Sequence, residues 1–183
     1  MSSAASDSPR SSLRPLKRHI TAHDASGKGI FSDKVPSEAH VRQSTGGAME
    51  FSLMYTNKHD PLRLADDADV EAYASYLKTP PALTIPGGTV CRTVDFAPGY
   101  TSPMHRTVSL DFGVVLEGEV ELQLDSGETR LLKRGDVSVQ RGTNHAWRNT
   151  SKDQWCRMLY VLQAAESVTL AGTALDEDEG GID

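Results

Sequence analysis

Cysteine is scarce in the 183-residue chain, which carries two, and they do not form a redox or metal-binding pair. Cys91 and Cys156 each lie alone in a segment typical of a β-strand, and the chain has no C-x-x-C motif. We interpret both as reduced, buried thiols of the kind that a cytoplasmic protein carries, although the sequence leaves a disulfide between them open.

Long apolar segments and a secretory signal are also missing. No stretch reaches the roughly 20 apolar residues that cross a bilayer, and residues 1–18 have no apolar core among their serines and arginines. We therefore expect a cytoplasmic protein without a membrane partner. The same N-terminal stretch is poor in acidic residues, so an organelle transit peptide is the alternative that it leaves open.

Positive charge is in deficit as well. The 19 lysines and arginines are outnumbered by 25 aspartates and glutamates, which gives a net charge of −6. Such a chain is poorly suited to bind a phosphate backbone, and we predict no nucleic-acid partner. The motifs G-x-S-x-G, G-x-G-x-x-G, H-E-x-x-H and the P-loop are absent too, which leaves hydrolase-triad, nucleotide-binding and zinc-protease functions without support.

What the chain does contain is a long series of short β-type segments. From residue 83 onward they follow one another closely, and several end at a glycine. This spacing, without β-α-β alternation or internal repeats, predicts one all-β domain built as an antiparallel sandwich or small barrel. The predicted strands are 89–96, 111–118, 119–125, 128–135, 136–142, 145–149 and 154–165.

The region before the barrel predicts an N-terminal arm over residues 17–82. Two short strands are expected within 17–33 around the turn at residues 25–28, and a third strand at 48–57. Residues 64–81 predict the one short helix, capped by Asp66 or Asp67 and ended by two prolines. Its apolar stripe consists of Val70, Tyr73, Tyr76 and Leu77.

The two ends of the chain predict no regular structure. Residues 1–16 are rich in serine and are expected to be disordered. The barrel is expected to span residues 83–168. The remainder, residues 169–183, predicts a flexible C-terminus because it is acidic, and we assign it no role.

His105 begins the part of the sequence that carries chemistry. Because side chains at i and i+2 of a strand point the same way, His105 and Thr107 share a face, and Asp111 follows on the same run. His145, on a later strand, is the partner with matching context. Two imidazoles and one carboxylate leave positions open on a metal, as in non-haem iron and Lewis-acid sites.

Two stretches resemble the paired motifs of the cupin superfamily. The first motif is matched by Gly99, His105, Thr107, Asp111 and Gly118. The second is matched by Gly135, Arg141-Gly142, His145 and Asn149, with one residue fewer between Gly135 and His145. The resemblance covers residues 85–165 and extends to small single-domain cupins of fungal secondary-metabolite gene clusters. It implies a cupin-type antiparallel β-barrel, also called a double-stranded β-helix or jelly roll.

The departures from the motif bear on the metal. The resemblance implies a divalent ion held by three histidines and a glutamate, but Thr107 replaces one histidine and Asp111 replaces the glutamate. The metal ligands that carry over, which we also predict as the catalytic groups, are His105, Asp111 and His145. A threonine is a weak neutral ligand, so zinc, iron, manganese or nickel would be held weakly or be absent. In its absence the same three side chains would form an acid/base cluster.

Four further residues are predicted to bind substrate. Arg92 alternates with apolar residues, so on an interior face it would clamp a carboxylate or enolate. The alternative is an edge-strand arginine paired with Asp95 or with a surface glutamate. Tyr100 and Trp147 flank the ligands and either line the pocket or pack in the core. Thr107 lies between the two ligands of the first motif.

Together these features predict an enzyme that binds a small oxygenated secondary metabolite inside the barrel. The first hypothesis is a metal-assisted lyase or isomerase that catalyses a dehydration, decarboxylation, isomerisation or cyclisation. The second is a non-haem iron dioxygenase or other oxidoreductase at the same site, and the third is a non-catalytic binding protein. The resemblance also implies a homodimer, in which residues 17–57 could reach across to the second subunit.

Overall fold

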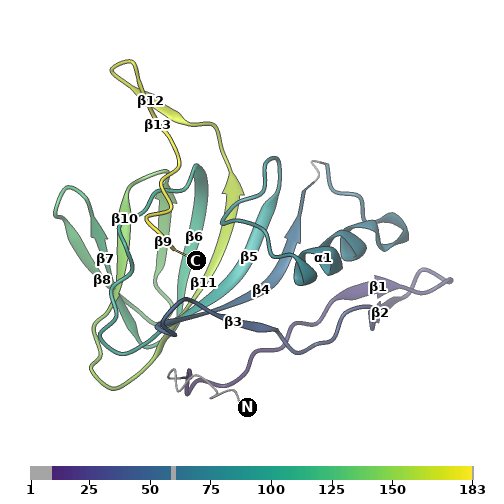
Figure 1. Ribbon diagram of the computed structural model, residues 1–183. Coiled ribbons are helices and arrows are strands. Elements are labelled where there is room, and N and C mark those ends of the chain that lie inside the picture. Colours follow the sequence, from purple (N-terminus) through teal and green to yellow (C-terminus); the bar gives the residue numbers. More distant parts are fainter. Residues whose placement is uncertain (1–9, 59–60, 183) are drawn as a thin grey trace, which may run out of the picture.

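The computed structural model describes residues 10–58 and 61–182. Two antiparallel sheets face each other and form a barrel, and two small hairpins lie outside it (Figure 1). The large sheet has the strand order β3-β4-β5-β11-β6-β9, and the small sheet has the order β10-β7-β8. The predicted all-β barrel is therefore confirmed. The barrel strands are β3 (Val41–Gln43), β4 (Met49–Asn57), β5 (Thr89–Phe96), β6 (Ser109–Glu117), β7 (Glu119–Leu124), β8 (Thr129–Lys133), β9 (Val137–Arg141), β10 (His145–Asn149) and β11 (Cys156–Ala164).

The seven strands predicted after residue 83 are all present, with ends that move by two residues or fewer. Their turns depend on glycine, as at Gly118, where φ is +76°. A Cβ at Gly118 would also lie 3.0 Å from the Cβ of Cys156, so this corner between β6 and β7 needs glycine for two reasons.

The barrel interior is filled by side chains at alternate positions of the strands, as period-2 geometry requires. Val90, Val94 and Phe96 of β5 are buried in this core together with Trp147 of β10. Cys156 is buried and Cys91 is half-buried, and both are free thiols in the part of the chain that is described. No helix among the described residues is long and apolar enough to cross a membrane.

The arm contributes two of the barrel strands. β3 and β4 pair with each other, and β4 pairs with β5 of the same chain, so the barrel sheet begins well before residue 83. A register shift between Leu53 and Tyr55 bends β4. Beyond it Tyr55 packs against Tyr73 of the helix, with ring centroids 4.7 Å apart.

The rest of the arm lies to one side of the barrel (Figure 1). Two short strands, β1 (Thr21–His23) and β2 (Gly29–Phe31), form the predicted hairpin. A short 3₁₀ turn, η1 (Ala65–Asp67), leads into the predicted helix, α1 (Ala68–Lys78). The predicted cap is wrong: Asp67 precedes the helix in a left-handed conformation without capping it. Its carboxylate binds Lys34 Nζ at 2.9 Å instead.

A buried ion pair ties the N-terminal segment to the outer face of the large sheet. Arg157 of β11 donates from Nε and Nη2 to the two carboxylate oxygens of Asp95 on β5, at 2.5 and 2.6 Å. Ser11 Oγ also donates to Asp95, and Arg157 donates to the carbonyl of Arg14. Residues 10–16, predicted to be disordered, are thus held against the sheet. Residues 1–9 of that prediction lie outside the described residues.

Asn149 joins three strands at one end of the barrel. Its side chain is fully buried, and Nδ2 donates to the carbonyls of Phe96, Ala97 and Gln154 at 2.8 to 3.1 Å. Its Oδ1 accepts the N–H of Ser151. One amide therefore satisfies backbone groups at the end of β5 and just before β11.

The region that follows β11 forms a hairpin and a segment that returns to the barrel. No strands were predicted here, yet β12 (Val168–Leu170) pairs with β13 (Thr173–Leu175). Both strands are mostly exposed, so their side chains give no buried face from which they could have been predicted. After β13 the chain turns back and ends against the barrel (Figure 1).

Candidate functional site

The barrel interior contains one cavity that gathers most of the predicted site residues. Its volume is about 50 Å³. Arg92, His105, Thr107, Asp111, His145 and Trp147 all line it, and Tyr100 does not. Tyr100 packs beside the core instead, which corresponds to the alternative of core packing left open for it.

His105 and His145 meet because their backbones pair. The N–H of each residue donates to the carbonyl of the other at 2.9 Å, which places the segment before β6 alongside β10. Their rings are 4.3 Å apart between centroids. Both side chains are buried, so two imidazoles face the same small interior space.

The hydrogen bonds of the two rings fix their tautomers. His105 Nδ1 lies 3.0 Å from the carbonyl of Pro103, and His145 Nδ1 lies 2.9 Å from the carbonyl of Thr143. A carbonyl only accepts, so each Nδ1 carries the hydrogen in the neutral ring. Each Nε2 is left with a free lone pair, which can take a proton or bind a cation.

Burial keeps both imidazoles neutral. Desolvation lowers the pKa of His105, with opposing contributions from the Pro103 hydrogen bond and the charge of Asp178. Desolvation and the nearby His105 lower the pKa of His145 from 6.5 to about 4. Near neutral pH both rings are therefore bases without a proton on Nε2.

The lowered pKa of His145 predicts a loss of stability in mild acid. Between pH 6.5 and about 4 the unfolded chain binds a proton at this residue that the folded chain does not, so stability falls as pH falls through this window. The fall should reach about 3 kcal/mol for a shift of this size. Urea unfolding at about pH 7 and about pH 4.5 should show a smaller loss for His145→Gln than for the wild type. The exposed His23→Gln should lose as much as the wild type, and equal losses in all three proteins would contradict the assignment.

Asp111 is oriented by the threonine that replaces the motif histidine. Thr107 Oγ1 donates to Asp111 Oδ2 at 3.1 Å, and Ser109 Oγ donates to Thr107 Oγ1 at 2.8 Å. Asp111 Oδ1 is buried and has no partner. Burial raises the pKa of this carboxyl, and the hydrogen bonds and Arg92 oppose the rise. Thr107 thus positions a carboxylate.

The three predicted metal ligands line one cavity but do not converge. Among residues 10–58 and 61–182 no three His, Cys, Asp or Glu side chains are grouped closely enough to hold a metal ion. Only the two imidazoles are close, and the Asp111 carboxylate is bound to Thr107. The predicted set His105, Asp111 and His145 does not fit a three-ligand site in this arrangement.

Arg92 is a buried cation without a carboxylate partner. Its Nη2 donates to the carbonyls of Ala82 and Leu83 at 2.7 and 3.2 Å, while Nε has no partner. No salt bridge to Arg92 is found among the described residues. Asp95, the alternative partner, is bound to Arg157. Desolvation lowers the pKa of Arg92 to about 10, which still leaves it charged at neutral pH.

Tyr160 and Gln140 are polar lining residues that were not predicted as site residues from the sequence. Tyr160 of β11 is opposite Arg92 in the strand register, and its hydroxyl is buried without a partner. Gln140 of β9 is opposite Asp111. The sequence feature that could have identified them is the alternation within each strand, which places Tyr160 on the same face as Met158 and Leu162. Burial raises the pKa of Tyr160 well above its ordinary value, so its hydroxyl keeps the proton.

Comparisons with known proteins support the cupin-type barrel. The sequence profile of the family described as "Cupin domain" matches residues 92–162, a span from Arg92 on β5 to Leu162 on β11. "Phomopsin biosynthesis cluster protein C'" of Diaporthe leptostromiformis is 49% identical over 170 residues, which cover 93% of this chain and 87% of the relative.

Two other relatives match along nearly the whole chain. "Oryzines biosynthesis cluster protein J" of Aspergillus oryzae is 44% identical over 174 residues, covering 95% of this chain and 97% of that protein. "Cupin-domain-containing oxidoreductase srdB" of Neurospora crassa is 42% identical over 172 residues, covering 94% of this chain and 85% of that protein. The likeness therefore includes the arm and the region after β11 as well as the barrel.

Proposed function

The chain belongs to the cupin family of fungal biosynthesis-cluster proteins, and on that premise we propose that it is an enzyme of lyase or isomerase type. Its substrate would be a small, oxygenated, anionic secondary metabolite. The reaction would be a dehydration, decarboxylation, isomerisation or cyclisation. One observation carries the proposal: two neutral imidazoles with free Nε2 atoms share a cavity with an unpaired arginine.

Arg92 provides the binding charge in this proposal. A cation that is buried without a counter-ion is costly, and a substrate carboxylate or enolate would supply the missing charge through bonds to the guanidinium. The Tyr160 hydroxyl, whose pKa stays far above neutral, can donate a hydrogen bond to the same anion.

The imidazole pair provides the proton transfer. A neutral His105 or His145 can accept a proton at Nε2 from a carbon or hydroxyl of the bound substrate. The second ring is within reach to return a proton elsewhere on the molecule, since the ring centroids are 4.3 Å apart. Asp111, held by Thr107, lines the same cavity and interacts through its charge with Arg92, the binding cation.

The test is the change in elemental formula of the substrate. Extract of a host strain lacking this protein would be incubated with the purified protein and followed by accurate mass. A product that is isomeric, or that has lost water or carbon dioxide, supports the proposal; loss of two hydrogens or gain of oxygen contradicts it. His105→Ala and His145→Ala should lower the rate by about 100-fold or more, since general bases contribute that much. An unchanged rate in both variants would indicate a non-catalytic binding protein.

An oxidoreductase is the second candidate, favoured by the two free Nε2 atoms and by the name of the Neurospora relative, a cupin-domain-containing oxidoreductase. His105 and His145 would provide two ligands for a divalent metal, and such an ion would supply redox or Lewis-acid chemistry. The metal content of protein purified without a tag tests this candidate. The wild type should contain about one iron or other divalent ion per chain, and His105→Ala and His145→Ala should both lose it. Metal that is equally abundant in the variants would contradict this site.

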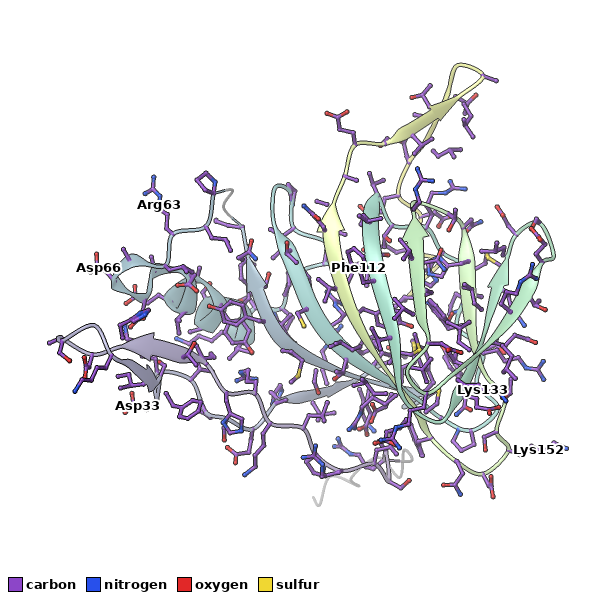
Figure 2. All side chains as sticks on the ribbon, turned by 180° about the vertical axis from the view of Figure 1, so that it is seen from behind. Asp33, Arg63, Asp66, Phe112, Lys133 and Lys152 are labelled. Carbon is purple, nitrogen blue, oxygen red and sulfur yellow. The ribbon has the colours of Figure 1, made fainter. Side chains whose placement is uncertain are left out.

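We also propose a homodimer, formed through the outer face of the large sheet. Phe112 of β6 is opposite Val139 of β9, and Val114 is opposite Val137. Phe112, Val137 and Val139 are 41%, 56% and 52% exposed, and Phe112 lies near the middle of the sheet in Figure 2. Apolar residues that adjoin on an open face are typical of an interface.

Val139→Asp is therefore expected to convert dimer to monomer, because it would bury a charge against the partner. Light scattering after gel filtration measures this. Val168→Asp, on the exposed β12, is the matched control and should leave the mass unchanged. A wild-type monomer at all concentrations would rule the interface out.

The cytoplasmic location expected from the sequence stays a prediction.

A further inference from the structure

The segment of residues 176–182, here called the capping segment, crosses the barrel beside the histidine pair. It descends from the β12–β13 hairpin to the barrel (Figure 1). The N–H of Arg106 donates to the carbonyl of Asp178 at 2.7 Å, and the N–H of Asp178 donates back to the carbonyl of Arg106 at 2.9 Å. Arg106 is the neighbour of His105, so this bridge lies next to one of the two rings.

Gly180 fits the capping segment closely to the barrel. A Cβ at this position would lie 2.3 Å from the carbonyl oxygen of Met104, a distance that no side chain can occupy without displacing the backbone. The next residue provides a comparison. Gly181 has φ of +83°, further into the positive region than the +58° of Gly180, but a Cβ there would meet nothing within 4 Å.

Ile182 brings the capping segment into the site itself. Its half-buried side chain packs against the barrel core and lines the same cavity as Arg92, His105 and His145. With Ile182 in place the cavity has about 50 Å³, room for a few water molecules. Sites for small organic ligands typically have about 300 Å³ or more, so a metabolite and the seated segment compete for one space.

The attachment of the capping segment is slight. Its residues before Ile182 are all exposed, and within the described part of the chain its backbone hydrogen bonds to the barrel are the two with Arg106. Segments with few buried contacts and exposed hydrogen bonds open far more easily than the core to which they attach. The segment is also acidic: Glu179 acts on Arg92 and Asp178 acts on His105 through their charges.

We propose that the capping segment is a displaceable occupant of the ligand entrance: Ile182 and the acidic residues before it fill the place of an anionic ligand, and the segment must leave before that ligand binds. This regulation rests on the proposed function, because it takes the barrel interior as the ligand site. The protein is closed at rest, and a ligand gains access only by replacing its own chain.

Chemical access to the histidine pair tests the proposal without an activity assay. The full chain and a chain ending at Leu175, both treated with chelator, would be reacted with diethyl pyrocarbonate and analysed residue by residue by mass spectrometry. The deletion should speed modification of His105 and His145 by about tenfold or more, as expected when a local closing contact is removed. The exposed His23 should react equally in both chains. Equal rates at the histidine pair would overturn the proposal.

Two single substitutions keep the test independent of the deletion. Gly180→Ala should reproduce most of the acceleration because its methyl group collides with the Met104 carbonyl. Gly181→Ala adds the backbone strain of a positive φ but meets no atom within 4 Å, so it should accelerate modification far less. Equal behaviour of the two variants would overturn the close fit that the proposal requires. The proposed function can fail separately from the capping segment. If the deletion speeds modification of the histidines but the protein converts no metabolite, the enzymatic function is refuted and the capping role stands. If the protein converts a metabolite but the deletion leaves the modification rates unchanged, only the capping role is refuted.

Discussion

Asp95→Ala is expected to destabilise the fold by about 3–5 kcal/mol, the usual cost of removing one partner from a buried ion pair. The side chains of Asp95 and Arg157 are 5% and 9% exposed and share two hydrogen bonds. After the substitution the Arg157 guanidinium would remain buried without its counter-ion. Urea unfolding near neutral pH measures the loss, and with it the N-terminal segment should lose its attachment to the sheet because Ser11 also binds Asp95.

A double replacement separates lost charge from lost packing. Asp95→Leu combined with Arg157→Leu removes both charges, and it should recover at least about half of the stability lost in Asp95→Ala. The control is the pair of Arg148, which is exposed, and Glu121, which is half-buried, at 3.5 Å. Arg148→Ala should cost less than about 1 kcal/mol. If Asp95→Ala cost no more than this control, the buried pair would not be a significant support of the fold.

Arg92→Met is expected to raise KM for the metabolite by about 100-fold while leaving the protein folded, since a charged hydrogen-bonding partner is worth about 1.5–3 kcal/mol. The free energy of unfolding should change by less than about 1 kcal/mol, because the lost bonds to Ala82 and Leu83 are offset by removal of an unpaired buried charge. Steady-state kinetics and urea unfolding of the same variant give both quantities.

This combination distinguishes a binding residue from a structural one. A structural arginine would lose stability and activity together, whereas Arg92 should lose substrate affinity alone. Arg92→Lys keeps the charge without the planar guanidinium, so its KM should lie between the KM of the wild type and that of Arg92→Met. Arg130→Met, at an exposed position, should change neither quantity. A large loss of stability in Arg92→Met with unchanged KM would contradict the assignment.

The barrel could be predicted from the sequence because its information is local. Alternation along residues 89–96 places Arg92 on the inner face with Val94 and Phe96, and the structure confirms this. Glycines in the turns mark the strand ends for a similarly local reason, since a positive φ excludes most other residues. The family motifs brought His105 and His145 together although 40 positions separate them in the printed chain.

The parts that could not be predicted depend on contacts between distant segments. Thr107 is placed correctly by the motif, but its donation to Asp111 depends on the bend into β6. Ile182 enters the cavity from a stretch whose composition predicts only a flexible, acidic end. Exposed strands such as β12 have no buried face and therefore no pattern. In each case the sequence gives the residue type but not the tertiary neighbour.

Asn149 has one consequence for modification of the protein. Together with Thr150 and Ser151 it forms an N-x-S acceptor sequence for N-linked glycans. A glycan would replace a hydrogen of Nδ2, the atom that donates to three carbonyls in a fully buried position. Folding and glycosylation at this site therefore exclude each other: a chain that carried the sugar could not close this end of the barrel, and a folded chain offers the sugar no place to attach.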